Sequence, residues 1–322
     1  VQACGDAHLA NFGLFASPER ELVFGLNDFD ETLRGPWEWD LKRLATSFTI
    51  AGRDNGLNGN QIRKATSRVA QSYRQAMHDF AGWRTTDIWY ALLRAADIQA
   101  WAHSQRGARR IASASAKAKM KHHRQALDRL AEEVEGKYRL KSEPPLLVPL
   151  RELGQKLVQV NEQMIRAAYQ DYVESLAPDC RVLLDHYRPV DFALKVVGVG
   201  SVGTRCWILL LEGRDRNDPL FLQMKEATKS VLAEHVRPSP YETHGRRVVE
   251  GQRLMQTVND IFLGWTHTPE TGRDYYWRQL RDWKGSADID SMRAVDLTRY
   301  ARHQPQIHRS GSLIDLPIVT RK

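Results

Sequence analysis

Long hydrophobic runs and paired cysteines are absent from this sequence. No stretch of about eighteen consecutive apolar residues occurs in its 322 residues, so the sequence predicts no transmembrane helix and no membrane partner. The three cysteines, Cys4, Cys180 and Cys206, form no Cys-x-x-Cys pair, which argues against a disulfide framework and a thiolate zinc site. These absences favour a reducing compartment, and we expect a cytoplasmic protein.

The sequence also predicts no secretory signal peptide. The sequence begins at Val1, directly before a loop rich in polar residues, and we therefore expect that an upstream segment is missing. A length of 322 residues is sufficient for two lobes, each with its own hydrophobic core.

Positive charge is in excess, with a formal net charge of +8 and a pI near 9.4. This excess favours an anionic partner such as a nucleotide. Part of the excess lies in one run that holds seven Lys or Arg and no acid: Arg106, Arg109, Arg110, Lys117, Lys119, Lys121 and Arg124. Such a basic run more often forms a solvated helix face than a binding site, so nucleic-acid binding through it is a less favoured alternative.

Polar residues flank a predicted β-hairpin near the N-terminus. Residues 12–16 and 22–26 are apolar runs joined by a polar turn that contains proline. Because a hairpin returns its second strand beside its first, we expect Asp6, Asn11 and Asp28 to converge at one end of it. Their hard oxygen atoms suit Mg²⁺ rather than Zn²⁺, whereas simple turn caps are the alternative.

A helix is predicted directly after Gly35 and Pro36, with Asp40 in its first turn. Asp40 can complement the helix dipole there. A buried aspartate at this position can also hold the backbone of the Asp6 loop by hydrogen bonds.

The middle of the chain is predicted to be helical and the following part to form strands. Four helices are expected between residue 61 and about residue 182: 61–80, 86–103, 108–136 and 148–175. Five strands are expected after residue 191: 192–197, 204–213, 220–227, 261–265 and 275–281, with a helix over 246–256. The end of the last strand and the residues after it, 279–284, would form a hinge near an adenine pocket.

A glycine-rich turn joins the first two of these strands. A dinucleotide-binding fold requires a helix directly after such glycines, whereas here a second strand follows. Strand, glycines and strand are the arrangement of a kinase-type flap over nucleotide phosphates, with a flexible hairpin turn as the alternative. The turn residues expected to bind the nucleotide are Gly198, Gly200, Ser201 and Gly203.

A lysine on the third strand, Lys225, can then reach the α- and β-phosphates. A carboxylate is expected to keep this lysine charged and correctly aimed. We expect that carboxylate to be Glu250, on the helix 246–256, in preference to Glu234 or Glu242.

The N-terminal motifs resemble the catalytic segment of the aminoglycoside-phosphotransferase branch of protein-kinase-like folds. The resemblance implies that Asp6 is the catalytic-loop aspartate, that Asn11 and Asp28 bind the metal and that Asp40 anchors the loop. The motifs that carry it, in order, are Gly5-Asp6-x-His8-x-x-Asn11, Asn27-Asp28-Phe29-Asp30 and Gly35-Pro36-x-x-x-Asp40-Leu41-x-x-Leu44-Ala45.

More closely, the chain resembles the bacterial family named domain of unknown function 2252, which has a kinase-like assignment and no established substrate. The resemblance spans residues 3–286. The stretches that carry it are CGDAHLANFG, NDFDE, GPWEWDLKRLA, VVGVGSVGTRC, PLFLQMKEA, RVVEGQRLMQ and RQLRDWKGS.

The order of these parts departs from that of ordinary kinases, in which the glycine flap and the lysine precede the catalytic loop. The resemblance therefore implies an α+β, protein-kinase-like, two-lobe fold in circularly permuted order. Residues 1–60 would carry the catalytic loop and metal-binding segment, residues 61–185 the helical part of the large lobe, and residues 186–286 the small antiparallel nucleotide-binding lobe. Residues 287–322 would form a truncated or altered C-terminal segment, because Pro305 breaks the expected helix.

The sequence thus predicts an ATP- and Mg²⁺-dependent phosphotransferase that acts on an unidentified hydroxyl acceptor. Asp6 would orient the acceptor hydroxyl or accept its proton, His8 would shape the loop and Asp30 would support the site. A non-catalytic nucleotide-binding regulatory module is the main alternative. Either interpretation requires Lys225 and Asp28 to face one cleft, within about 15 Å of each other.

Overall fold

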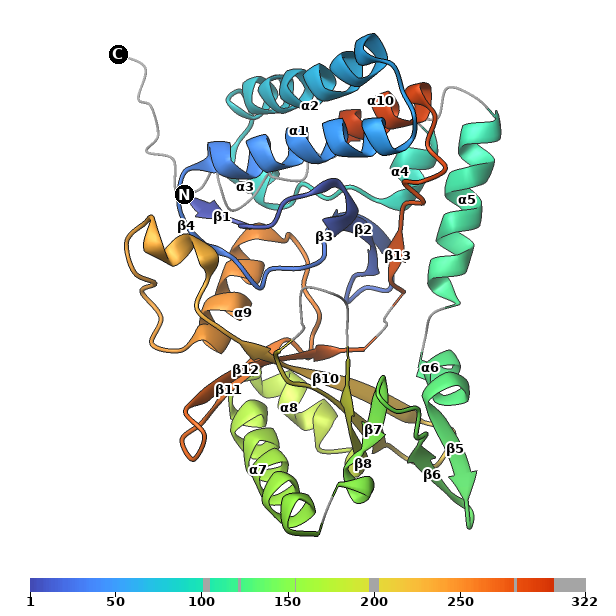
Figure 1. Ribbon diagram of the computed structural model, residues 1–322, viewed down its shortest axis with the longest axis vertical. Coiled ribbons are helices and arrows are strands. Elements are labelled where there is room, and N and C mark those ends of the chain that lie inside the picture. The colour runs from blue at the N-terminus through green and yellow to red at the C-terminus, as the bar shows by residue number, and fades with distance from the viewer. Residues whose placement is uncertain (101–104, 121–122, 154, 197–202, 281–282, 304–322) are drawn as a thin grey trace.

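The computed structural model describes residues 1–100, 105–120, 123–153, 155–196, 203–280 and 283–303. Helices and small sheets gather at one end of the molecule, and a six-stranded sheet forms the other end (Figure 1). The chain passes from the first part to the second through α5 (Gln105–Lys119) and α6 (His123–Leu130), and it returns after the sheet's β12. The predicted α+β class with antiparallel sheets is confirmed.

Three helices pack side by side at the helical end: α1 (Trp37–Asp54), α2 (Gly59–Phe80) and α10 (Ala294–His303). α2 begins where a capping box forms, because Asn58 and Gln61 exchange side-chain-to-backbone hydrogen bonds of 3.0 Å. The helix predicted over 61–80 is therefore confirmed, with a start two residues earlier.

The single helix expected over 86–103 is wrong within its described part. The structure has α3 (Thr85–Trp89) and α4 (Ala95–Ala100), separated by an extended segment. This segment lies against the edge of β3 (Leu22–Leu26), where the N–H of Phe24 donates to the carbonyl of Leu93 at 2.9 Å. A tertiary hydrogen bond thus competes with the helix at this point.

The predicted N-terminal hairpin is confirmed as β2 (Phe12–Ala16) and β3. A third strand, β13 (Gly285–Ser286), joins it by pairing with β2 after the chain has returned from the six-stranded sheet. Two short strands, β1 (Gln2–Ala3) and β4 (Leu33–Arg34), pair nearby, and a 3-10 turn (Leu9–Asn11) precedes β2.

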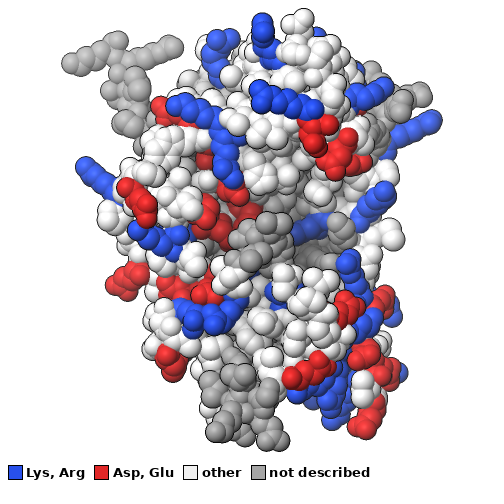
Figure 2. Space-filling view, viewed as in Figure 1, with Lys and Arg blue, Asp and Glu red and all other residues white. Residues whose placement is uncertain are grey.

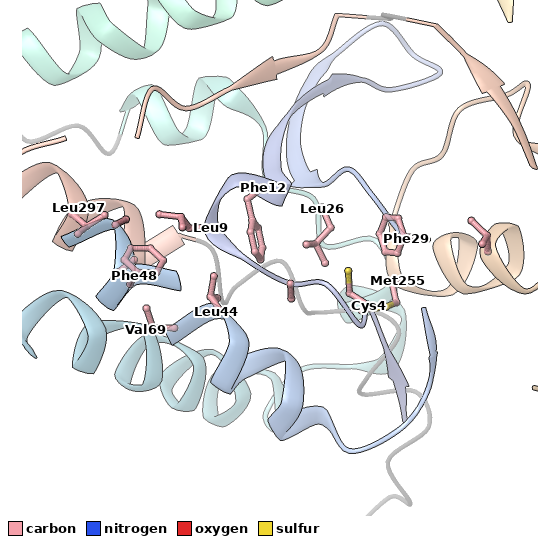
Figure 3. Close-up of a cluster of buried hydrophobic side chains, with 14 of the residues drawn as sticks. Cys4, Leu9, Phe12, Leu26, Phe29, Leu44, Phe48, Val69, Met255 and Leu297 are labelled. Atoms are coloured by element: carbon pink, nitrogen blue, oxygen red, sulfur yellow. The ribbon is translucent and has the colours of Figure 1, made fainter. Parts of the chain in front are cut away.

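The core beneath the hairpin draws side chains from distant parts of the chain (Figure 3). Phe12 and Leu26 from the hairpin meet Leu44 and Phe48 of α1 and Met255 of α9 (His244–Met255), and all five are at least 95% buried. Burial of apolar surface on both sides of the hairpin fixes the position of the polar loops at its end.

The six-stranded sheet is antiparallel throughout, in the order β11-β12-β10-β9-β8-β7. All five predicted strands are present, with bounds that differ by a few residues. The short β7 overlaps the start of the helix predicted over 148–175, which is therefore wrong at that end. The strands are β7 (Leu147–Pro149), β8 (Arg188–Lys195), β9 (Cys206–Glu212), β10 (Pro219–Ala227), β11 (Gly264–Thr268) and β12 (Arg273–Gln279).

The two faces of this sheet differ in character. α7 (Gln155–Glu174) and α8 (Pro178–Leu184) cover one face, where Trp277 stacks on Tyr172 with ring centroids 4.5 Å apart. On the other face, α6 covers apolar residues such as Phe221, whereas Gln223 and Lys225 follow at alternate positions along β10. This strand therefore changes from apolar to polar along one face.

A hairpin replaces the end of the helix predicted over 108–136. After α5 and α6, the strands β5 (Ala131–Val134) and β6 (Lys137–Leu140) pair around a two-residue turn. Glu135 and Gly136 both have positive φ, 51° and 74°, as a type I′ turn requires. A short 3-10 turn over Leu150–Glu152 follows β7, and another over Val231–Glu234 follows β10.

Within the described residues, no helix is both long and apolar enough to cross a membrane. All three cysteines are free thiols, and Cys4 and Cys206 are buried.

A glycine on α9 allows this helix to pack tightly against the N-terminal strands. A β-carbon at Gly251 would lie 2.7 Å from the hydroxyl oxygen of Thr32, whereas a β-carbon at Gly59 of α2 would contact nothing within 4 Å. We expect Gly251→Ala to lower the free energy of unfolding by about 1–3 kcal/mol through overpacking. Gly59→Ala is the control and should not destabilise. Urea titration measures both, and equal effects would contradict the packing argument.

Candidate functional site

The loop that carries Asp6 is held by Asp40 of α1. The two carboxylate oxygens of Asp40 accept hydrogen bonds from the backbone N–H groups of Cys4, at 2.7 Å, and Gly5, at 2.9 Å. Asp40 is buried, and Gly5 has a φ of 80°, in the region that favours glycine. The hydrogen bonds expected of Asp40 are therefore present, and they fix the backbone immediately before Asp6.

The side chain of Asn11 joins this loop to the loop after the hairpin. Its amide nitrogen donates to the carbonyls of Asp6, at 3.0 Å, and Asp28, at 2.9 Å. Its amide oxygen accepts from the backbone N–H groups of Asp28, at 2.8 Å, and Asn27, at 3.2 Å. Asn11 is buried, and both ends of its side-chain amide are hydrogen-bonded, so it holds the loops of Asp6 and Asp28 together. Its oxygen could bind a metal only by giving up the hydrogen bonds that it accepts from the backbone.

Asp6 itself lies at the surface of the loop, with a side chain that is about one-third exposed. Its carboxylate forms an ion pair with Arg43 of α1, and Nε2 of His8 lies 3.6 Å from its second oxygen. Asp6 is thus accessible to a substrate, and Arg43 and His8 limit its orientation.

Lys225 reaches the loop that carries Asp28 and Asp30 from the six-stranded sheet. Its ammonium nitrogen lies 2.5 Å from a carboxylate oxygen of Asp30 and 3.7 Å from one of Asp28. The lysine is buried, although 195 residues separate it from Asp30. The requirement that Lys225 and Asp28 face one site is therefore met.

The predicted pairing of Lys225 with Glu250 is replaced by these contacts. Glu250 lies on α9, where its carboxylate is 3.3 Å from Arg253, and Lys225 is paired with Asp30. Glu234, one of the alternative partners, lies instead near Lys229, at 3.8 Å. Asp30 competes successfully because the loop after the hairpin lies directly opposite the sheet face that carries Lys225.

A second residue of α9, Arg247, holds this loop and was not identified from the sequence. Its guanidinium donates to the carbonyls of Thr32, at 2.6 Å, Asp30, at 2.8 Å, and Thr228, at 2.8 Å. Arg247 is 2% exposed, and burial lowers its pKa below the ordinary value. An arginine in a helix rich in Arg gives no sequence signal of such a role, since solvated arginines are the usual case.

Two further cations lie beside Asp28. Arg278 of β12 donates to the carbonyl of Asn27 at 3.1 Å and to the side chain of Gln223 at 3.2 Å. Lys284, between β12 and β13, interacts electrostatically with Asp28 and with Arg278. The sequence placed Lys284 in the expected hinge without a role for it. Figure 2 shows a hollow between the two ends of the molecule with basic and acidic surface at its walls.

Charge and burial shift the pKa values in this cluster. Burial raises the pKa of Asp28, but Lys225, Arg278 and Lys284 outweigh it and hold that pKa below its usual value. Burial, followed by the positive charge of Arg278, lowers the pKa of Lys284 from 10.5 to about 7. Shifted groups around a shared site are typical of functional positions.

The glycine turn can be placed only in part. β8 and β9 are paired antiparallel strands on either side of it, as predicted. Gly203 has a φ of 91° at the start of β9. Gly198, Gly200 and Ser201 lie outside the described residues.

Sequence similarity places the chain in a bacterial family. A family described as "Uncharacterized protein conserved in bacteria (DUF2252)" matches residues 1–306. The chain belongs to this family. No curated protein and no solved structure matches the chain.

The carboxylate of Asp28 gives this DUF2252 chain a potential metal ligand. One oxygen each of Asp28 and Asp30 is buried without a hydrogen-bond partner. In the described part of the chain, no group of three or more His, Cys, Asp or Glu side chains is placed to hold a metal. Mg²⁺ commonly takes only one or two carboxylates and completes its shell with water and substrate phosphates. The residues present fit such an ion at Asp28.

Removal of the carboxylate that pairs with Lys225 tests the revised pairing. We expect Asp30→Asn to lower the free energy of unfolding by about 1–3 kcal/mol, because a buried ammonium loses a charged partner. Glu250→Gln should change it by less than about 0.5 kcal/mol. Chemical denaturation of both variants measures the difference, and a larger loss for Glu250→Gln would restore the original pairing.

Lys284 makes stability depend on pH. Because its pKa is about 7 in the folded protein and 10.5 ordinarily, the unfolded chain binds more protons between these values. The free energy of unfolding contributed by this group therefore rises as pH increases from 7 to 10.5. We expect Lys284→Met to be more thermostable than wild type at pH 7, with a gain that shrinks towards pH 10.

Thermal unfolding in phosphate-free buffers measures this gain. Lys229→Met, at an exposed lysine, is the control and should show no such trend. A pH-independent difference for Lys284→Met would show that the lysine titrates normally.

Proposed function

We propose that this protein is an ATP- and Mg²⁺-dependent phosphotransferase with a kinase-like, circularly permuted arrangement. The observation that carries the proposal is the contact of Lys225 with Asp28 and Asp30. This contact brings Lys225, on the strand that follows the two strands of the glycine turn, to the loop that carries Asp28 and Asp30. In protein kinases, a strand lysine and a metal-binding aspartate act on the same phosphates.

The topology of the sheet supports this proposal. β8 and β9 flank the glycine turn, Lys225 lies on the next strand, β10, and a helix, α9, follows before β11. The motifs of the helical end, Asp6, Asn11 and Asp28, lie opposite this face and are linked by the amide of Asn11. Chain order is unimportant to such a site, since its chemistry depends on packing.

Each residue then has a distinct task. Lys225 would release Asp28 to bind the α- and β-phosphates, while Asp30 keeps its ammonium group oriented. Asp28, with Asn11 once its oxygen is released, would hold Mg²⁺, which supplies neutralisation of phosphate charge. Asp6 would orient an acceptor hydroxyl and take its proton. Positioning and charge stabilisation would supply most of the rate acceleration.

A second function, a non-catalytic nucleotide-binding module, is favoured by two observations. The oxygen of Asn11 is occupied by two backbone donors, and Asp6 is paired with Arg43. Such a module would bind ATP through Lys225 and transfer no phosphoryl group. ATP binding without consumption of ATP, across a broad panel of hydroxyl acceptors, distinguishes this function from the enzyme.

Asp28→Asn tests the phosphotransferase. The substitution keeps the size of the side chain and removes its charge, so we expect Mg-ATP turnover to fall by at least about 100-fold. Asp54→Asn, at the exposed end of α1, is the control and should retain full turnover. Turnover is measured as ATP consumption with a panel of hydroxyl acceptors, after circular dichroism has shown that both variants fold. Undiminished turnover in Asp28→Asn would refute the assignment.

A further inference from the structure

A groove lies between α1 and α2, which run side by side at the helical end (Figure 1). Its volume is about 360 Å³, within the range of pockets that hold small molecules. α1 contributes Thr49 and Arg53 to the lining of this α1–α2 groove, and the first part of α2 contributes the rest. None of the lining residues belongs to the site around Lys225, so the proposed function does not account for the groove.

Hydroxyl groups form the floor of the α1–α2 groove. The two helices approach closely beside it, since a β-carbon at Gly52 would lie 2.9 Å from Cγ1 of Ile62. The half-buried Thr49 and Thr66 follow, with their hydroxyl oxygens hydrogen-bonded at 2.9 Å. When Thr49 donates in this bond, the hydroxyl of Thr66 is left to donate to a ligand. Ser67, which also lines the groove, adds an exposed hydroxyl.

Positive charge in the α1–α2 groove is not balanced by an acid in its lining. Arg53 and Arg63 are exposed, one from each helix, and neither forms an ion pair within the described part of the chain. No Asp or Glu among the described residues lines the groove, and Asp54, next to Arg53 along the chain, lies outside the lining. α2 as a whole carries four Lys or Arg against one acid, Asp79, near its far end.

This combination differs from an ordinary solvated helix face. A single exposed arginine on a helix is usually just hydrated. Here two arginines from different helices share one hollow with the hydroxyls of Thr66 and Ser67, and all of these groups are hydrogen-bond donors. A set of donors without a carboxylate favours an anion.

We propose that the α1–α2 groove binds the phosphate group of a small phosphate monoester. A guanidinium matches phosphate oxygens with two parallel N–H donors. A phosphate group has three acceptor oxygens, enough for Arg53, Arg63 and the hydroxyls of the floor at once, whereas a carboxylate has two. The groove is larger than a phosphate ion, which leaves room for an organic group beside Ile62. The inference does not depend on the phosphotransferase.

Calorimetric titration of the intact protein with inorganic phosphate, ribose 5-phosphate and ribose tests this inference, at about 0.15 M salt to screen diffuse charge. We expect both phosphate compounds to bind and ribose not to bind. Arg53→Gln and Arg63→Gln should each weaken phosphate binding at least about fivefold, less than a buried charge-assisted hydrogen bond would give, because the groove is open to solvent. Arg68→Gln removes an exposed charge of α2 outside the lining and should change the affinity less than about twofold.

The substituted arginines are exposed, and unchanged thermal unfolding midpoints without phosphate confirm that each variant folds. Absence of binding of either phosphate compound to wild type overturns the inference. Equal affinity of wild type and both groove variants would place the phosphate elsewhere and overturns it too, as does an equal loss in Arg68→Gln. Binding of a short single-stranded oligonucleotide through Arg53 and Arg63, without binding of either phosphate compound, would replace it with a nucleic-acid surface. The proposed function is tested separately, because none of these substitutions changes Lys225 or Asp28.

Discussion

The ion pair between Lys225 and Asp30 joins the two ends of this molecule, and the arrangement of the site depends on it. A buried ammonium is costly unless a charged partner lies beside it. The sheet that carries Lys225 must therefore pack where the loop after the hairpin can supply a carboxylate. Arg247 of α9 is also buried, and its guanidinium donates to the carbonyls of Thr32 and Asp30 in that loop. Two buried cations, rather than apolar contact alone, thus fix the loop opposite the sheet.

Local patterns allowed much of the fold and of the site to be predicted from the sequence. The apolar runs around a polar turn predicted the hairpin of β2 and β3, and with it the approach of Asp6, Asn11 and Asp28. The largely apolar run after the polar turn at residues 214–219 predicted the strand that carries Lys225. In each case the signal is periodicity or turn chemistry within some twenty residues, which short-range sterics and side-chain polarity decide.

Features decided by packing between distant segments were not predictable in this way. The partner of Lys225 depends on which loop faces β10, and no spacing in the sequence encodes that. β7 has only three residues, too few to show a strand period, and it is a strand because it pairs with β8. The hairpin of β5 and β6 replaces the end of the helix predicted over 108–136, and its turn depends on positive φ angles at Glu135 and Gly136.

The position of α9 has a consequence for motion between the two ends. Val248 and Val249 of this helix belong to the same buried cluster as Leu44 and Phe48 of α1, and that cluster also contains Tyr276 of the sheet. The two ends therefore have no separate hydrophobic cores on this side, and α9 acts as a shared wedge between them. A rigid-body swing about the linking segments alone would break that cluster open. Any widening of the site must instead pivot on α9 and leave this cluster intact.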